Sequence, residues 1–280
     1  MTSWKFPLAL LTLIGLPLLP GCGEPAPIAD DMVQVPAGTY TIGRDDSFAN
    51  EAPAHTVTLP AFEIDRYEVT NREFKRFVNA DDCPGPLYEG APDPCVYDGA
   101  VQSNTRIDYY SNGNYSFYPV LNVRWDQADA YCRWKGKRLP TEAEWEAAAR
   151  GSEALLYPWG NDAPDCTLAN YEGCTPDAIR TDELEAASPF GAIQMAGNVA
   201  EWTSDNYNDT YYAWGPTENP QGPERGASKV VRGGSWYCPA EKVTATFRDQ
   251  ADPKLQYNTV GFRCARALGE DTSTSPSPTP

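Results

Sequence analysis

Histidine is almost absent from this sequence, in which His55 is the only one among 280 residues. Zinc sites built from several histidines are therefore excluded, and a Ser-His-Asp hydrolase would depend on this residue alone. His55 lies immediately before the alternating run "TVTLPAF", so we interpret it as a structural residue at the edge of a strand. The sequence thus excludes most familiar hydrolases.

Basic residues are also scarce. Lys and Arg number 22 against 39 Asp and Glu, which gives a formal net charge of -17 at pH 7. A chain of this charge repels phosphate backbones and anionic surfaces, so we exclude nucleic acid as a partner. The acidity fits either simple solubility or the binding of cations.

Long apolar runs are limited to the N-terminus, "MTSWKFPLALLTLIGLPLLPGCGEPAP". The run of about 15 residues is too short and too interrupted by proline to span a membrane as a mature helix. Residues 1–21 resemble a bacterial lipoprotein signal peptide cleaved before Cys22, whose sulfur would carry the lipid, and residues 22–31 indicate a tether. A plain secretory signal is the alternative. We expect an extracytoplasmic protein, anchored by its lipid alone to the cell envelope, in the periplasm or at the outer membrane.

The rest of the chain is long enough for one large domain with a core of its own. We assign residues 32–268 to a single compact domain and expect a monomer. Residues 269–280 have the Ser/Thr/Pro composition of a disordered tail, which should carry no chemistry.

Most of the cysteines should pair in an oxidising compartment. They stand at positions 22, 83, 95, 132, 166, 174, 238 and 264. Removing the lipidated Cys22 from these eight leaves seven, so one thiol remains over. Short loop-like segments predict the bridges Cys83–Cys95 and Cys166–Cys174. Cys132 and Cys264 would then form a long-range bridge and leave Cys238 unpaired, although sequence alone leaves an exchange of partners open.

Local patterns predict an α+β class with much irregular structure. The stretches "MVQVPAGTYTIG" and "HTVTLPAFEID" have the composition of short strands. Helices are expected in "TNREFKRFVNA", in "DQADAYCRWKG" and in "PTEAEWEAAARG", the first and third opening on capping boxes. Residues 152–250 show no sustained period, so we expect long ordered loops there, held by disulfides, ions or buried aromatics.

Six motifs occur in order along the chain: "EVTNREF", "GKRLPTEAEWEAAARG", "YPWGN", "GNVAEW", "RGGSW" and "VGFRCAR". Together they resemble the sulfatase-modifying-factor domain, the family of the formylglycine-generating enzyme. The resemblance implies a single domain with little regular secondary structure, similar to C-type-lectin-like folds and stabilised by calcium in several members.

The resemblance also implies a chemistry. Catalytic members oxidise a cysteine of an unfolded sulfatase segment to formylglycine, using oxygen and a copper(I) ion that two cysteines hold. The first of these cysteines lies three residues after the "RGGS" serine and the second five residues further on. Here the serine is Ser235 and the two positions are Cys238 and Val243, so the second ligand is absent. Oxidase activity is therefore expected to be impaired or lost.

Three interpretations of Cys238 stay open at this point. It could be structural, either bridged to Cys132 or Cys264 or buried as an inert thiol. It could retain oxidase chemistry as a catalytic residue together with Ser235. Finally, Cys238 and Ser235 could line an old cleft that now binds a ligand.

Calcium is the second cofactor that the resemblance implies. One family site falls on Gln194, Gly197, Val199 and Glu201, with Asn198 shaping the turn. A second falls near Asn170 and Tyr171. For both sites the alternative is a solvated polar loop.

Aromatic residues gather in the loop-rich half of the chain. They are Trp159, Trp202, Trp214, Trp236, Tyr207, Tyr211, Tyr212 and Tyr237. Most should belong to the core, whereas exposed ones would suit stacking on sugars or peptides. An unfolded polypeptide or a glycan is thus the expected partner, for an active copper oxidase in one hypothesis and for a binding module in another.

Overall fold

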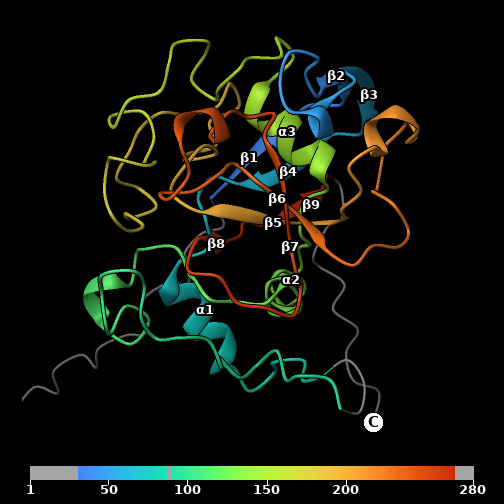
Figure 1. Ribbon diagram of the computed structural model, residues 1–280. Helices are drawn as coiled ribbons and strands as arrows, with labels where there is room; N and C mark the ends of the chain where they lie inside the picture. The colour runs from blue at the N-terminus through green and yellow to red at the C-terminus, as the bar shows by residue number, and fades with distance from the viewer. Residues whose placement is uncertain (1–30, 87–89, 269–280) are drawn as a thin grey trace, which may run out of the picture. The chain divides into compact units, whose positions relative to one another are not determined.

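The computed structural model describes residues 31–86 and 90–268 (Figure 1). The predictions for residues 1–30, including lipidation of Cys22, and for residues 269–280 lie outside the described residues. Within the described part of the chain, no helix is long and apolar enough to cross a membrane.

Three small sheets form the β structure of the described residues. The strands are β1 Met32–Val35, β2 Gly38–Ile42, β3 His55–Leu59, β4 Phe62–Asp65, β5 Ala200–Asn206, β6 Lys229–Arg232, β7 Arg248–Ala251, β8 Val260–Gly261 and β9 Ala265–Ala267. Strands β1, β4 and β9 form one antiparallel sheet, and β2 pairs with β3. The third sheet has the order β7-β6-β5-β8, in which only β5 and β8 are parallel. Both predicted strand regions near the N-terminus are confirmed.

Three α-helices form where the sequence predicts them. They are α1 Asn71–Val78, α2 Trp125–Trp134 and α3 Glu142–Arg150. Complete capping boxes start α1 at Thr70 and α3 at Thr141. Helix α3 ends at Gly151, whose φ of 66° is accessible to glycine with little strain. Every residue of α3 is buried, so this helix lies inside the domain.

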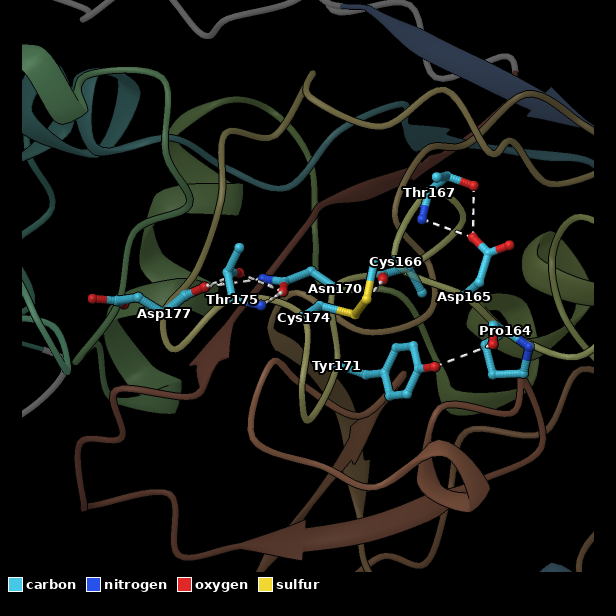
Figure 2. Close-up of a disulfide and its surroundings, with 10 residues drawn as sticks. Pro164, Asp165, Cys166, Thr167, Asn170, Tyr171, Cys174, Thr175 and Asp177 are labelled. Carbon is cyan, nitrogen blue, oxygen red and sulfur yellow. Dashed lines mark hydrogen bonds between the residues drawn. A yellow bond between two sulfur atoms is a disulfide. The ribbon is translucent and has the colours of Figure 1, made fainter.

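The three predicted disulfides are confirmed. Cys132 of α2 is joined to Cys264, directly before β9, across a sequence separation of 132 residues. The local bridges are Cys83–Cys95 and Cys166–Cys174, the second of which is drawn in Figure 2. The α+β class with long ordered loops is confirmed as well, since residues 151–199 between α3 and β5 contain neither helix nor strand.

In the part of the chain that the structure describes, the core consists of three hydrophobic clusters. The first joins Trp145 of α3 to the strands β1 to β4, and the second packs α1 and α2 on Trp202 and Phe262. The third surrounds Trp236 with residues from the loops. Of the eight aromatic residues named in the loop-rich half, half are buried, namely Trp202, Trp236, Tyr211 and Tyr212. Trp159 and Tyr207 are partly buried, and Trp214 and Tyr237 remain 58% and 71% exposed.

Candidate functional site

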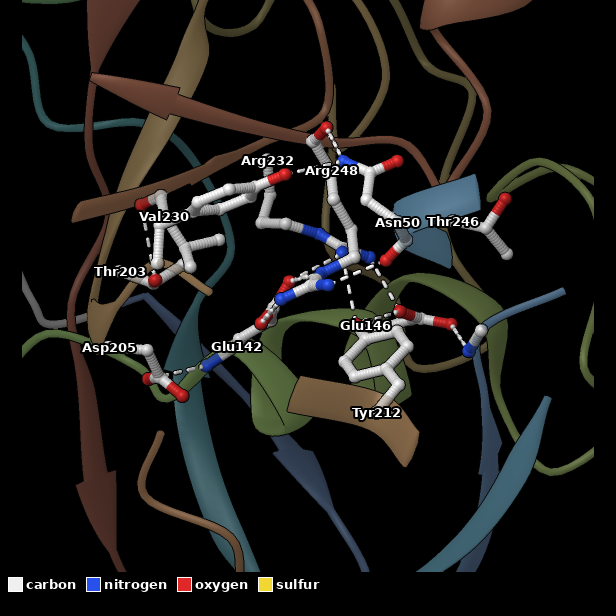
Figure 3. A network of polar contacts seen from close by, with 12 residues as sticks. Asn50, Glu142, Glu146, Thr203, Asp205, Tyr212, Val230, Arg232, Thr246 and Arg248 are labelled. Atoms are coloured by element: carbon white, nitrogen blue, oxygen red, sulfur yellow. Dashed lines mark hydrogen bonds and ion pairs between the residues drawn. The ribbon is translucent and has the colours of Figure 1, made fainter. Parts of the chain in front are cut away.

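Cys238 lies on the connection between β6 and β7. Buried charged side chains link the two ends of this connection. Arg232 at the end of β6 pairs in register with Arg248 at the start of β7. Both guanidinium groups bind the carboxylate of Glu142 on α3, with Nη1 of Arg232 at 2.9 Å and Nε of Arg248 at 2.6 Å (Figure 3). Arg232 also donates to Glu146 at 2.6 Å. Helix α3 therefore fixes both ends of the segment that carries Cys238.

Asp205 makes this charge network sensitive to pH. Its Oδ2 accepts a hydrogen bond from the backbone N–H of Glu142, and burial together with the Glu142 charge raises the pKa of Asp205 to about 7. In the unfolded chain the same carboxyl titrates near 3.8. Between these values the folded protein binds the extra proton, so the free energy of unfolding falls as pH rises from about 4 to 7 and then levels off.

We expect Asp205→Asn to remove this part of the pH dependence. Between pH 5 and pH 8 the stability of the variant relative to the wild type should rise by about 2.5 kcal/mol, because asparagine does not ionise. Urea unfolding of both proteins at the two pH values measures the difference. The exposed Asp249→Asn serves as the control and should keep the wild-type dependence. Equal pH slopes for Asp205→Asn and the wild type would contradict the assignment.

Two glycines start the connection, because the chain turns tightly there. Gly233 and Gly234 have φ values of 90° and 67°. A Cβ on Gly234 would lie only 2.3 Å from the carbonyl oxygen of Lys242, so the "RGGS" motif brings the strand end against the short 3-10 helix η4, Ala240–Lys242. The backbone N–H of Cys238 then donates to the carbonyl of Ser235 at 2.9 Å.

Hydrogen bonds from two other loops position Cys238. The backbone N–H of Glu172, inside the Cys166–Cys174 loop, donates to the carbonyl of Cys238 at 2.9 Å. The backbone N–H of Trp236 donates to the carbonyl of Asn198 at 2.8 Å. The structure thus brings two of the six motifs, "GNVAEW" and "RGGSW", together with the Cys166–Cys174 loop near Cys238.

The thiol of Cys238 is partly exposed and opens on a cavity of about 200 Å³. Its Sγ lies 3.5 Å from Oγ of Ser235. Other residues that line the cavity are Phe247, Asp249, Tyr257 and Val260. The two residues predicted for catalysis are therefore in contact, at the edge of a space that admits a small group.

The arrangement does not fit a copper ion held by two cysteines. Among the residues that the structure describes, Cys238 is the one free cysteine, since the other six form disulfides. Val243 is fully buried, and its Cγ1 would lie 3.1 Å from a Cβ added to Gly234. A methyl group thus packs at the position predicted for the second sulfur. Copper(I) prefers thiolate ligands, and here it would find a single one.

The region predicted for one calcium ion is held by internal hydrogen bonds. Oδ1 of Asn170 accepts from Oγ1 of Thr175 at 2.5 Å, and its Nδ2 donates to the carbonyl of Asp177 (Figure 2). The hydroxyl of Tyr171 donates to Pro164 at 3.1 Å. Asn170 and Tyr171 are therefore committed to the loop itself, and the side-chain oxygen of Asn170 does not fit a calcium ligand without releasing Thr175.

The second predicted calcium site fits in part. Oε1 of Gln194 is buried and makes no hydrogen bond with any described residue. A buried oxygen without a hydrogen-bond donor is suited to bind a cation. Gly197 and Val199 lie in the same turn, where Asn198 has a φ of 56°. Glu201 differs, because Arg263 binds its two carboxylate oxygens at 2.7 Å each. No group of three or more His, Cys, Asp or Glu side chains suited to a metal occurs in residues 31–86 and 90–268.

Asn198 does more than shape its turn. Its Nδ2 donates to both carboxylate oxygens of Glu68, and its Oδ1 accepts from the backbone N–H of Ile179 at 2.9 Å. Burial, with the charge of Glu201, holds the pKa of Glu68 well above its usual range. Sequence reasoning missed Glu68 and Arg263. The signal available was their position inside the motifs "EVTNREF" and "VGFRCAR", where charged residues stand among apolar ones.

Comparison with known proteins tests the resemblance that the six motifs indicate. A sequence model of the sulfatase-modifying factor enzyme 1-like domain matches residues 23–268. The formylglycine-generating enzyme of Bos taurus is 35% identical over 293 residues, which cover 88% of this chain and 77% of the bovine protein. This chain belongs to the sulfatase-modifying-factor family.

Membership of the sulfatase-modifying-factor family does not by itself decide activity. A Mus musculus protein named inactive C-alpha-formylglycine-generating enzyme 2 is 29% identical, covering 96% of this chain and 95% of its own length. The solved structure of PvdO from Pseudomonas aeruginosa is 28% identical with a TM-score of 0.68, covering 85% of this chain and 94% of that one. The residues at the site must therefore decide the chemistry.

Proposed function

We propose that this protein is a formylglycine-generating-enzyme-like protein of the cell envelope that has lost the two-cysteine copper oxidase site. The observation that carries the proposal is the buried Val243 at the second copper position, beside a single free thiol at Cys238. A second thiolate is needed to hold copper(I) in a low-coordinate state that stays open to oxygen and substrate. An active copper oxidase is the alternative.

The cavity at Cys238 supports a second candidate function, the binding of an extended polypeptide without conversion. The cavity volume of about 200 Å³ suits a small side chain. Tyr237, which directly precedes Cys238 in the sequence, is 71% exposed. Hot spots for binding are enriched in such aromatic residues. In this candidate, Cys238 and Ser235 line the cleft and the thiol is dispensable.

One experiment separates these functions. The reduced, copper(I)-loaded full-length protein is mixed in air with a cysteine peptide derived from a sulfatase, and both bound peptide and formylglycine are measured by mass spectrometry. We expect no formylglycine above the level of the Cys238→Ala variant. Peptide that binds equally to both proteins would support the binding candidate, whereas formylglycine formed by the wild type alone would overturn the proposed loss of activity.

Two further parts of the proposal concern a membrane anchor and a bound calcium ion. We propose anchoring to the bacterial envelope through a lipid on Cys22, from the signal-like residues 1–21. We also propose one calcium ion at the turn of Gly197 and Val199, where Gln194 offers a buried oxygen. Such an ion would act by holding the turn, and Glu201 would join it only by giving up part of its contact with Arg263.

A further inference from the structure

The connection between β5 and β6 forms a second cavity, of about 640 Å³, that shares no lining residue with the cavity at Cys238. It lies around the 3-10 helix η3, Tyr211–Ala213. The residues that line it combine two rings, three amides and two opposite charges. They are Tyr211, Trp214, Asn208, Asn219, Gln221 and the neighbours Glu224 and Arg225.

Trp214 offers an aromatic face to solvent. Its side chain is 58% exposed, although a tryptophan in a domain of this size is usually mostly buried. The ring does not swing freely, because it packs edge-on against Tyr211 at 5.0 Å and 88°, and its Nε1 donates to Oγ1 of Thr210 at 3.3 Å. The ring is therefore held in place before any ligand arrives, which lowers the entropy lost on binding.

Tyr211 supports the exposed ring of Trp214. The side chain is only 5% exposed and lines the cavity. Its hydroxyl is fully buried and lies beside the backbone of Gly222. Because this hydroxyl is fully buried, Tyr211 contributes its ring to the cavity and not a hydrogen bond to a ligand.

The connection is rigid because it is tied to the N-terminal half of the domain. The backbone N–H of Asn219 donates to the carbonyl of Thr58 in β3 at 2.8 Å, and Thr58 donates back to Thr217 at 2.8 Å. In Figure 1 this orange segment runs beside β3. A Cβ on Gly222 would lie 2.7 Å from that of Asp205, so the segment also packs tightly on the end of β5.

We propose that this cavity is a binding site for a neutral glycan, with Trp214 as the stacking platform. The apolar face of a sugar ring stacks on an exposed aromatic ring, and amide groups recognise its hydroxyls. Oδ1 of Asn208 already accepts from Thr210, and Nε2 of Gln221 donates to Asn219, so the amide nitrogens of Asn208 and Asn219 and the oxygen of Gln221 would meet the ligand. The adjacent charges of Glu224 and Arg225 cancel, which favours an uncharged ligand. The proposal does not depend on Cys238 or on the fate of the oxidase site.

The test uses three defined probes, chitotriose, cellotriose and maltotriose, each titrated calorimetrically into the full-length protein. The detergent must lack a sugar headgroup, because a glycoside detergent would compete. We expect at least one trisaccharide to bind with a Kd of about 1 mM or tighter, and Trp214→Ala to weaken that binding at least about tenfold. Gln221→Ala provides a second variant at the cavity and should weaken the same binding.

Tyr237→Ala is the matched control, since it removes another exposed aromatic side chain, which lies next to Cys238 instead. It should leave trisaccharide binding unchanged, and Trp214→Phe should retain most of it. The proposal is overturned if none of the three probes binds, if Trp214→Ala binds as well as the wild type, or if a proline-rich peptide occupies the cavity and the sugars do not. The glycan proposal does not depend on the peptide assay at Cys238, so a failure of peptide binding there would not affect it.

Discussion

Replacing Val243 by cysteine is expected to raise the affinity of the protein for copper(I) at least about a hundredfold, because it supplies the missing second thiolate. Cysteine is smaller than valine, so it enters the buried position beside Gly234 without overpacking. The short η4 helix, Ala240–Lys242, joins this position to the partly exposed Cys238. Competition with a copper(I) chelator under reducing conditions measures the affinity and keeps the two thiols from forming a disulfide.

Two controls tie that gain to the pair of sulfur atoms. Val243→Ala removes the same methyl groups without adding a thiol, and its copper affinity should stay at the wild-type level. The double variant Cys238→Ala/Val243→Cys has one thiol again and should lose the gain. If the wild type already binds copper(I) as tightly as Val243→Cys, then another sulfur or nitrogen donor reaches the ion, and loss of the copper site is the wrong conclusion.

The sequence predicted the parts of this fold that depend on local chemistry. Thr70 with Glu73 and Thr141 with Glu144 satisfy the free backbone N–H groups at a helix start, and this requirement involves residues only three positions apart. The bridges Cys83–Cys95 and Cys166–Cys174 likewise span short loops. For Cys132 and Cys264 the argument was elimination, and the structure confirms the pair.

Contacts between distant segments could not be predicted in the same way. Glu201 illustrates this, because a carboxylate in a glycine-containing turn is typical of a calcium ligand, yet its partner Arg263 lies 62 positions away and both are buried together. Composition does not reveal which charges meet in a core. Likewise, Trp202 and Trp214 both lie in the stretch that shows no sustained period, but one is fully buried and the other 58% exposed.

The pair of Glu201 and Arg263 leads to the second large expected effect. Both side chains are buried, at 1% and 0% exposure, and Nε and Nη2 of Arg263 bind the two carboxylate oxygens. Arg263 also donates to the carbonyls of Asp65, Arg66 and Ile193. It is further the cation that offsets the buried Glu68. Removing Arg263 leaves the buried side chains of Glu201 and Glu68 without their positive partner. Breaking a buried ion pair by removing one partner is strongly destabilising, because the remaining charge stays buried and uncompensated.

We therefore expect Arg263→Met to lower the free energy of unfolding by about 4 kcal/mol, measured by urea unfolding at pH 7. Arg266→Met is the matched control in the same motif. Its ion pair with Glu63 is partly exposed, at 28% and 23%, and such pairs contribute about 1 kcal/mol or less. The double variant Arg263→Met/Glu201→Gln should recover part of the loss, since it removes one uncompensated charge. Equal losses for Arg263→Met and Arg266→Met, or no recovery in the double variant, would contradict this account of the buried pair.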